Sequence, residues 1–201
     1  MRQSPFNPRP VTLEGRFVRL EPMSADHAEG LFEAGRFDEL WTYMSVPPWR
    51  TVDDARQWMS AAMAAAEAGD AVPFVTIERA GGRAVGSTRF FDIRRAHRAL
   101  EIGHTWVAPA FQRTAINTEA KLLLLGHAFD ELGALRLQFK TDARNVRSQR
   151  ALERIGALRE GVLRRHMVLW DGFVRDSVCY SVIDTEWPAV RAKLESMLRR
   201  A

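Results

Sequence analysis

The sequence predicts an α+β fold in which helices cover both faces of a mixed, mostly antiparallel β-sheet. A strand, a long amphipathic helix and another strand follow one another over residues 100–141, and a right-handed crossover makes two such strands parallel neighbours. Elsewhere, short alternating apolar segments are separated by glycine-containing turns, as in antiparallel hairpins. Segments with helical periodicity between them supply the covering helices.

The N-terminal part is predicted to contain a strand pair and two helices. Residues 1–10 are polar and proline-rich, and we expect a loose leading segment. Apolar residues over 11–20 flank a Glu-Gly turn and indicate paired strands, and helical periodicity predicts helices over 24–35 and 51–69. The aromatic stretch 41–49 is broken by proline and cannot be a regular helix, so we interpret it as a wall of a substrate pocket or as simple packing.

The central part is predicted to contain three strands before the long helix. Alternation over residues 73–78 and 84–91 indicates a hairpin, because the Gly-Gly pair between them supplies a tight turn. A third strand is expected over 100–107. The strongest helical pattern of the chain then covers 118–132, and the next strand is expected over 135–141.

The C-terminal part is predicted to contain a short helix, a hairpin and a final helix. The short helix spans about 146–155 and ends at a glycine. Residues 164–170 and 173–183 are expected to pair around an Asp-Gly turn. The final helix begins near Pro188, since proline is favoured in the first turn.

Length and composition favour one soluble domain over residues 1–201. No apolar run approaches the roughly 20 residues of a membrane span, so we expect no membrane partner. The leading segment lacks the pattern of a secretory signal, and we expect a cytoplasmic protein. A single cysteine excludes an intrachain disulfide, and the histidines show no metal-ligand spacing, so we expect no metal.

The charge balance indicates an anionic partner. Lysine plus arginine number 29 against 25 acidic residues, and the pI is about 9.8. Nucleic acid and a phosphate-bearing cofactor both fit, but the chain has no helix-turn-helix or aromatic stacking platform, so a nucleic-acid partner is not expected. The densest run of arginines, over residues 144–165, is interpreted as a grip for phosphates or as a solvated helix face.

The start of the long central helix is a candidate anion site. A helix start leaves backbone N–H groups unpaired, and the helix dipole favours negative charge there. These two effects suit a pyrophosphate, to which Arg113 can add a contact. An ordinary helix capped by Asn117 or Thr118 is the alternative. Asn145 follows the second parallel strand and is expected at the same edge, where open α/β sheets bind ligands.

Several short motifs follow one another in a defined order and spacing along most of the chain. They are Leu13-Glu-Gly-Arg-Phe-Val-Arg-Leu-Glu-Pro22, Val85-Gly86-Ser87, Glu101-Ile-Gly103, Val107-x-Pro109, Gln112-Arg113-x-x-x-Asn117, Glu119-Ala120, Asn145-x-x-Ser148 and Ile155-Gly156-Ala157. Together they resemble the GNAT acetyltransferase superfamily, and specifically its RimJ/RimL-like branch. The resemblance implies a sheet splayed open between the strands at 100–107 and 135–141, with coenzyme A in the gap.

The resemblance also implies an activity and a set of site residues. The activity is acetyl transfer from acetyl-CoA to a primary amine by direct attack in a ternary complex. The cofactor-binding residues would be Trp106, Val107, Gln112, Arg113, Thr114, Ala115, Ile116, Asn117, Thr118, Asn145 and Ser148. Two departures from the family pattern are the absence of glycines at 115 and 117 and the presence of Leu152, where many relatives carry a tyrosine that reprotonates the thiolate. Ser148 or a water would then serve as the acid.

Such a reaction also needs a proton acceptor and an oxyanion donor. Glu101 is the candidate base, and the alternative interpretation is a surface carboxylate paired with one of the arginines in 94–98. His104 is another candidate acceptor by its ordinary pKa. Backbone N–H groups near Trp106 and Val107 are the expected oxyanion donors.

The acceptor amine stays open at this point. An α-amino group with a pKa near 8 is appreciably neutral at physiological pH, whereas a lysine near 10.4 costs roughly 3 kcal/mol more to deprotonate. This favours a protein N-terminus, in agreement with the RimJ/RimL resemblance. The alternatives are a small-molecule amine acetyltransferase and a catalytically idle protein that binds acyl-CoA for regulation. The sequence leaves a homodimer open.

Overall fold

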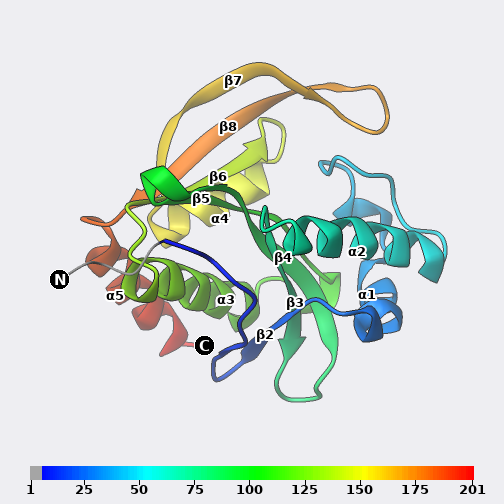
Figure 1. The fold of residues 1–201 in the computed structure, drawn as a ribbon, viewed down its shortest axis with the longest axis horizontal. Helices are drawn as coiled ribbons and strands as arrows, with labels where there is room; N and C mark the ends of the chain where they lie inside the picture. The colour runs from blue at the N-terminus through cyan, green and yellow to red at the C-terminus, as the bar shows by residue number, and fades with distance from the viewer. Residues whose placement is uncertain (1–5) are drawn as a thin grey trace.

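The structure is a computed structural model that describes residues 6–201, and its centre is one eight-stranded sheet (Figure 1). The strand order is β1-β2-β3-β4-β5-β6-β8-β7, and every neighbouring pair is antiparallel except β5 and β6. The strands are β1 (Leu13–Glu14), β2 (Val18–Pro22), β3 (Val72–Glu78), β4 (Ala84–Arg94), β5 (Ala99–Val107), β6 (Arg136–Asp142), β7 (Leu158–Val168) and β8 (Val174–Ile183). The predicted fold class is confirmed.

Helices cover the two faces of this sheet. They are α1 (Ala28–Gly35), α2 (Val52–Glu67), α3 (Ala115–Gly126), α4 (Val146–Ile155) and α5 (Trp187–Leu198). Leu124 and Leu125 of α3 belong to the larger buried cluster, together with the apolar side of α5 and the central strands. A second cluster joins α1 and α2 to the other face, and it contains Trp41 and Trp49. None of the helices in the described part has the length and apolar character needed to cross a membrane.

The sheet opens between its two parallel strands. β5 and β6 pair only at their first three positions, the last of which joins Glu101 and Gln138. Beyond that point β5 stays paired with β4 as far as Val107, and β6 stays paired with β8 as far as Asp142. Because each strand keeps its outer partner while the ladder between them ends, the strands diverge, as predicted for residues 100–107 and 135–141.

Glu119 of α3 fixes the turn between β1 and β2. Its buried carboxylate accepts hydrogen bonds from the backbone N–H groups of Arg16, Phe17 and Val18 at 2.8, 2.6 and 2.8 Å. A Cβ atom at Gly15 would lie 2.4 Å from the Glu119 carboxyl carbon, so this turn requires glycine. The hairpin at the start of the chain is thereby attached to the helix whose first turn is the candidate anion site.

Several element boundaries differ from the predicted ones. The central helix begins at Ala115 with Thr114 as its cap, so neither Asn117 nor Thr118 caps it. It ends in a π-helical turn over His127–Glu131. The last hairpin starts at Leu158, six residues earlier than predicted, because the chain begins pairing with β8 almost directly after α4.

β7 and the leading segment complete the fold. β7 is the edge strand, pairs only with β8 and is exposed along most of its length. The expectation of a loose segment over 1–10 is wrong for Phe6, which is buried in the α3-side core. The reason is that an aromatic side chain is stabilised by burial in the apolar core, which Phe6 shares with Leu100 and Phe129. Residues 1–5 lie outside the described part of the chain.

Candidate functional site

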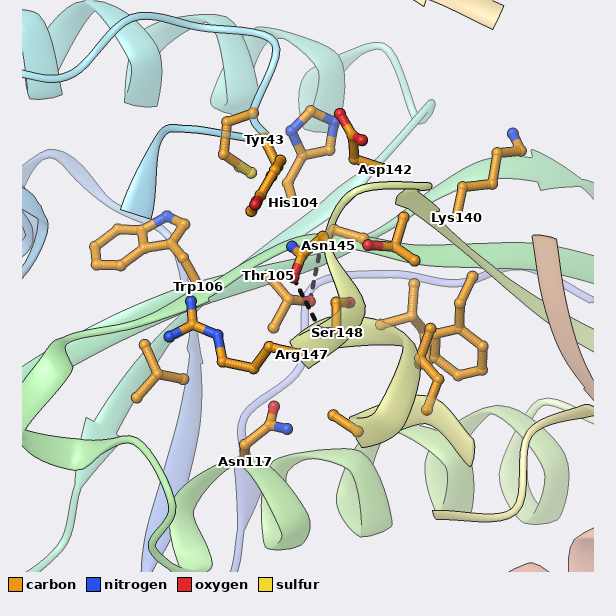
Figure 2. Close-up of a pocket in the computed structure, with 18 of the residues that line it drawn as sticks. Tyr43, His104, Thr105, Trp106, Asn117, Lys140, Asp142, Asn145, Arg147 and Ser148 are labelled. Carbon is orange, nitrogen blue, oxygen red and sulfur yellow. Dashed lines mark hydrogen bonds between the residues drawn. The ribbon is translucent and has the colours of Figure 1, made fainter. Parts of the chain in front are cut away.

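A cavity of about 680 Å³ occupies the gap between β5 and β6 (Figure 2). One wall comes from β5, where His104, Thr105 and Trp106 lie, and the starts of α3 and α4 contribute Asn117 and Asn145. The segment after α1 closes a further side. The cavity therefore lies where the sheet splays and where two helix N-termini meet it.

The first turn of α3 is organised as an anion site. Thr114 caps the helix by accepting a hydrogen bond from the N–H of Ile116 at 3.3 Å. No acceptor in the described part of the chain pairs with the backbone N–H groups of Arg113 and Thr114. Arg113 has a left-handed backbone with φ of 62°, and it supplies the tight turn that glycines would otherwise supply. Asn117 lies within the helix.

Gln112 connects this turn to α4. Its side-chain amide donates to the Val107 carbonyl at 2.9 Å, and its side-chain carbonyl accepts from the Arg147 guanidinium at 2.7 Å. Asn145 caps α4 by accepting from the N–H of Ser148 at 3.0 Å. These bonds fix the two helix starts at one end of the cavity, where free N–H groups and guanidinium groups suit a pyrophosphate.

Most of the predicted site residues line this cavity. They are Glu101, Trp106, Val107, Gln112, Arg113, Thr114, Asn117, Asn145 and Ser148. Ala115, Ile116 and Thr118 do not; they line a second cavity next to the end of α5. The helix period explains this division, since residues 114, 117 and 121 share one face of α3 and their neighbours point elsewhere.

Glu101 is buried where the parallel ladder ends. Its Oε2 atom accepts from the Gln138 side chain at 2.8 Å and forms an ion pair with Lys140 at 2.7 Å. Its partner is thus Lys140 and not one of the arginines in 94–98. In the described part of the chain Oε1 has no hydrogen-bond donor, and it lies beside Gly103, another residue of the cavity wall. One carboxylate oxygen can therefore accept a proton from a molecule in the cavity.

His104 is a poor proton acceptor in this fold. Burial, followed by the charges of Arg89 and Arg175, lowers its pKa from 6.5 to about 3. Its ring packs edge-on against Phe91, with centroids 5.1 Å apart, and its backbone is left-handed with φ of 48°. This histidine stays neutral at physiological pH and marks a bulge in β5.

Two buried N–H donors on residues that line the cavity have no partner. The Nε1 atom of Trp106 and the Nε atom of Arg175 lack an acceptor in the described residues, and both side chains line the cavity. Tyr43 and Met44 line the same cavity, whereas Trp41 and Trp49 pack in the core. The aromatic segment thus provides both wall and packing. Both donor atoms are closed off from the cavity in this conformation, so they destabilise the fold slightly and do not by themselves identify a ligand.

Lys121 is a cavity residue that the sequence reasoning missed. It is buried on α3, and its ammonium donates to the Thr105 hydroxyl at 3.2 Å. No carboxylate of the described residues pairs with it, and burial lowers its pKa from 10.5 to about 7. Its spacing of four residues from Asn117 could have indicated a shared helix face.

From the sequence, the arginines over residues 144–165 are interpreted either as phosphate-binding residues or as a solvated surface, and the structure places some in the cavity and others on the surface. Arg147, Arg150 and Arg154 of α4 line the cavity. The arginines of β7 are exposed along the edge strand, and Arg144 instead bonds Asp142. The run is therefore part cavity wall and part solvated surface.

Comparisons with known proteins agree with this geometry. The family described as acetyltransferase (GNAT) domain matches residues 18–158. A GCN5-related N-acetyltransferase from Brucella melitensis is 33% identical, with a TM-score of 0.89 over 94% of this chain and 86% of that one. Mycobacterium smegmatis RimJ in complex with CoA-disulfide is 25% identical, with a TM-score of 0.81 over 94% and 96%.

One relative carries a more specific name. "Putative ribosomal N-acetyltransferase YdaF" of Bacillus subtilis (strain 168) is 33% identical over 106 residues. The aligned stretch covers 53% of this chain and 57% of that protein, so it spans little more than half of either.

Proposed function

This chain belongs to the GNAT acetyltransferase family, and we propose that it moves an acetyl group from acetyl-CoA to a primary amine, with a protein N-terminus as the acceptor. The observation that carries the proposal is the cavity in the sheet splay, which is lined by the starts of α3 and α4, by Glu101 and by the aromatic segment. The helix starts suit phosphates, and the carboxylate suits the proton of an attacking amine.

The cofactor's phosphates would be held at the starts of α3 and α4. The free N–H groups of Arg113 and Thr114 lie at the positive end of the α3 dipole, which favours negative charge. Arg147 adds a guanidinium. Bound there, acetyl-CoA supplies an acyl group activated as a thioester. Asn117 and Ser148 flank the path from the helix starts into the splay.

The remaining chemistry is assigned to groups of the chain. Glu101 accepts the proton of the attacking amine at Oε1. Beyond Glu101, the inner edge of β5 has no pairing strand, so backbone N–H groups on that edge are available to an oxyanion. The buried walls exclude water, which strengthens both interactions.

The acceptor is inferred from the chemistry of the amine and from one relative. An α-amino group is less costly to deprotonate than a lysine, by roughly 3 kcal/mol. The Bacillus subtilis relative is named a putative ribosomal N-acetyltransferase, which agrees with a protein acceptor.

A mass-spectrometric screen with isotope-labelled acetyl-CoA tests the proposal. The protein is incubated with three kinds of acceptor. They are peptides with free N-termini, the same peptides with a blocked N-terminus and an added lysine, and small amines. We expect label on free N-termini, with the rate reduced in Glu101→Gln and unchanged in Glu67→Gln, an exposed control on α2. Label on small amines alone would show that the acceptor is a small-molecule amine and not a protein N-terminus. Coenzyme A binding without any transfer would favour the regulatory alternative.

A further inference from the structure

The structure contains a buried positive charge that the proposed reaction has not used. Lys121 is 5% exposed, lies inside the splay and has no carboxylate partner in the described residues. An ammonium has three donors, and the only hydrogen bond it makes to a described residue goes to Thr105. A buried charge without a partner destabilises the fold, so its position inside the cavity suggests a function.

The surroundings of Lys121 contain little that could neutralise it. From β5 it faces the Thr105 hydroxyl, which also shares a hydrogen bond of 2.8 Å with Thr88. From β6 it faces the ring of Phe139, whose centroid lies 6.0 Å from the ammonium. A neutral hydroxyl and an aromatic ring at that distance compensate only part of the lost hydration.

The carboxylates that line the cavity from β5 and β6 are already paired, Asp142 with Arg144. Glu101 on β5 and Lys140 on β6 form an ion pair with each other. On α4, Arg154 bonds the hydroxyl of Thr118 at 3.4 Å. The lowered pKa of Lys121 accordingly has burial as its cause. The missing counter-charge must come from a ligand if it comes at all.

Lys121 also lies too far along α3 to serve the phosphates. It is seven residues beyond Thr114, which at 1.5 Å per residue is about 10 Å along the helix axis. The phosphate end of the cavity already has the α3 dipole and Arg147. Acyl transfer from a thioester releases one other anion inside the splay, and that anion is the thiolate.

We propose that Lys121 donates the proton that converts the departing coenzyme A thiolate to a thiol. This inference rests on the proposed function and assigns the acid that Leu152 cannot supply. When the amine nitrogen bonds the acyl carbon, the carbon–sulfur bond breaks and its electron pair stays on sulfur. A proton passes from the Lys121 Nζ to that sulfur, and the neutral amine left behind takes a proton from solvent. A pKa of about 7 suits such a donor at neutral pH.

A binding experiment without turnover tests this role. Coenzyme A with a free thiol is bound to the wild type, Lys121→Met, Lys121→Arg and Lys193→Met, and thiolate absorbance is followed during a pH titration. We expect a buried ammonium to increase thiol ionisation by about tenfold or more in the wild type. The effect should persist in Lys121→Arg and in Lys193→Met, whose altered residue is exposed on α5, and vanish in Lys121→Met.

Kinetics then separate proton donation from charge alone. With an amine accepted by the wild type, Lys121→Met and Lys121→Arg should both lose about 100-fold in kcat with little change in KM for acetyl-CoA, since arginine keeps the charge but cannot release a proton. The wild-type fall in kcat at high pH should be absent from both variants, whereas the exposed control Lys193→Met should keep the wild-type kcat and pH profile.

Several results would overturn the role of Lys121. They are an unchanged thiol titration in Lys121→Met, full activity in Lys121→Arg, a loss in Ser148→Ala as large as that in Lys121→Met, and loss of coenzyme A binding in both lysine variants. If the wild type transfers acetyl to no amine, the proposed function fails, whereas the thiol titration still decides whether Lys121 lies at the sulfur.

Discussion

Replacing Lys121 by methionine should stabilise the protein, and by an amount that depends on pH. The pKa of Lys121 falls from 10.5 in an exposed lysine to about 7 in the fold because of burial. Between these values the unfolded chain binds a proton that the folded protein does not, so the free energy of unfolding rises with pH in this window. The destabilisation caused by the charged lysine is greatest below about pH 7 and disappears as the pH approaches 10.5.

The magnitude follows from the same two values. At 1.36 kcal/mol per tenfold change in proton binding, the charged lysine costs about 4 kcal/mol at pH 7 and about 2 kcal/mol at pH 9. Methionine has a similar length, is apolar and adapts to irregular space. The gain in unfolding free energy of Lys121→Met over the wild type should therefore shrink by about half between the two pH values.

Urea denaturation followed by far-ultraviolet circular dichroism measures this difference at pH 7 and pH 9. Lys193→Met serves as the control, because its side chain is exposed and its removal should leave stability within about 0.5 kcal/mol at both values. Groups other than residue 121 titrate alike in the wild type and the variant, so their effects cancel in the difference. A gain that does not vary with pH, or a loss of stability at pH 7, would refute the reasoning.

Four further changes have expected outcomes. Glu119→Gln should lower the unfolding free energy by about 1–3 kcal/mol in thermal or urea denaturation, since an NH2 group would face backbone donors. Gly86→Ala should cost about as much or more, because its Cβ would lie 2.2 Å from a backbone oxygen of β5, whereas Gly161→Ala meets nothing within 4 Å and should be neutral. In an acid titration, His104→Asn should lose less stability than the wild type between pH 6.5 and 3, where the unfolded state charges this histidine first. Arg147→Ala should weaken coenzyme A binding about tenfold in calorimetry, and an unchanged affinity would contradict its place in the phosphate site.

The arrangement of the elements could be predicted from the sequence because it depends on periodicity and on turn residues. The strand, helix and strand over residues 100–141 predicted the parallel pair, and the resemblance to the GNAT superfamily implied where the sheet opens. Helix and strand ends were less accurate. Thr114 caps α3 although Asn117 and Thr118 are also favoured capping residues, and the left-handed turn at Arg113 directly precedes the cap that is used.

The contacts inside the site could not be predicted in the same way. The pairing of Glu101 with Lys140 depends on the register between β5 and β6, which local sequence does not specify. Lys121 stands in a helix of strong apolar pattern, where a single lysine normally reaches solvent; only the packed sheet beneath it shows that it is buried. The unpaired indole N–H of Trp106 likewise depends on three-dimensional packing.

The edge strand β7 affects how copies of the protein meet one another. The free edge of β7 is eleven residues long and carries exposed leucines and valines, so a strand of another molecule can pair with it. Such pairing is a common route to aggregation. Arg159, Arg164 and Arg165 are exposed on the same strand. Two such edges brought together would bring several guanidinium groups into proximity, so like charge keeps the strands apart. Raising the salt concentration should weaken that protection and lower the solubility of the protein.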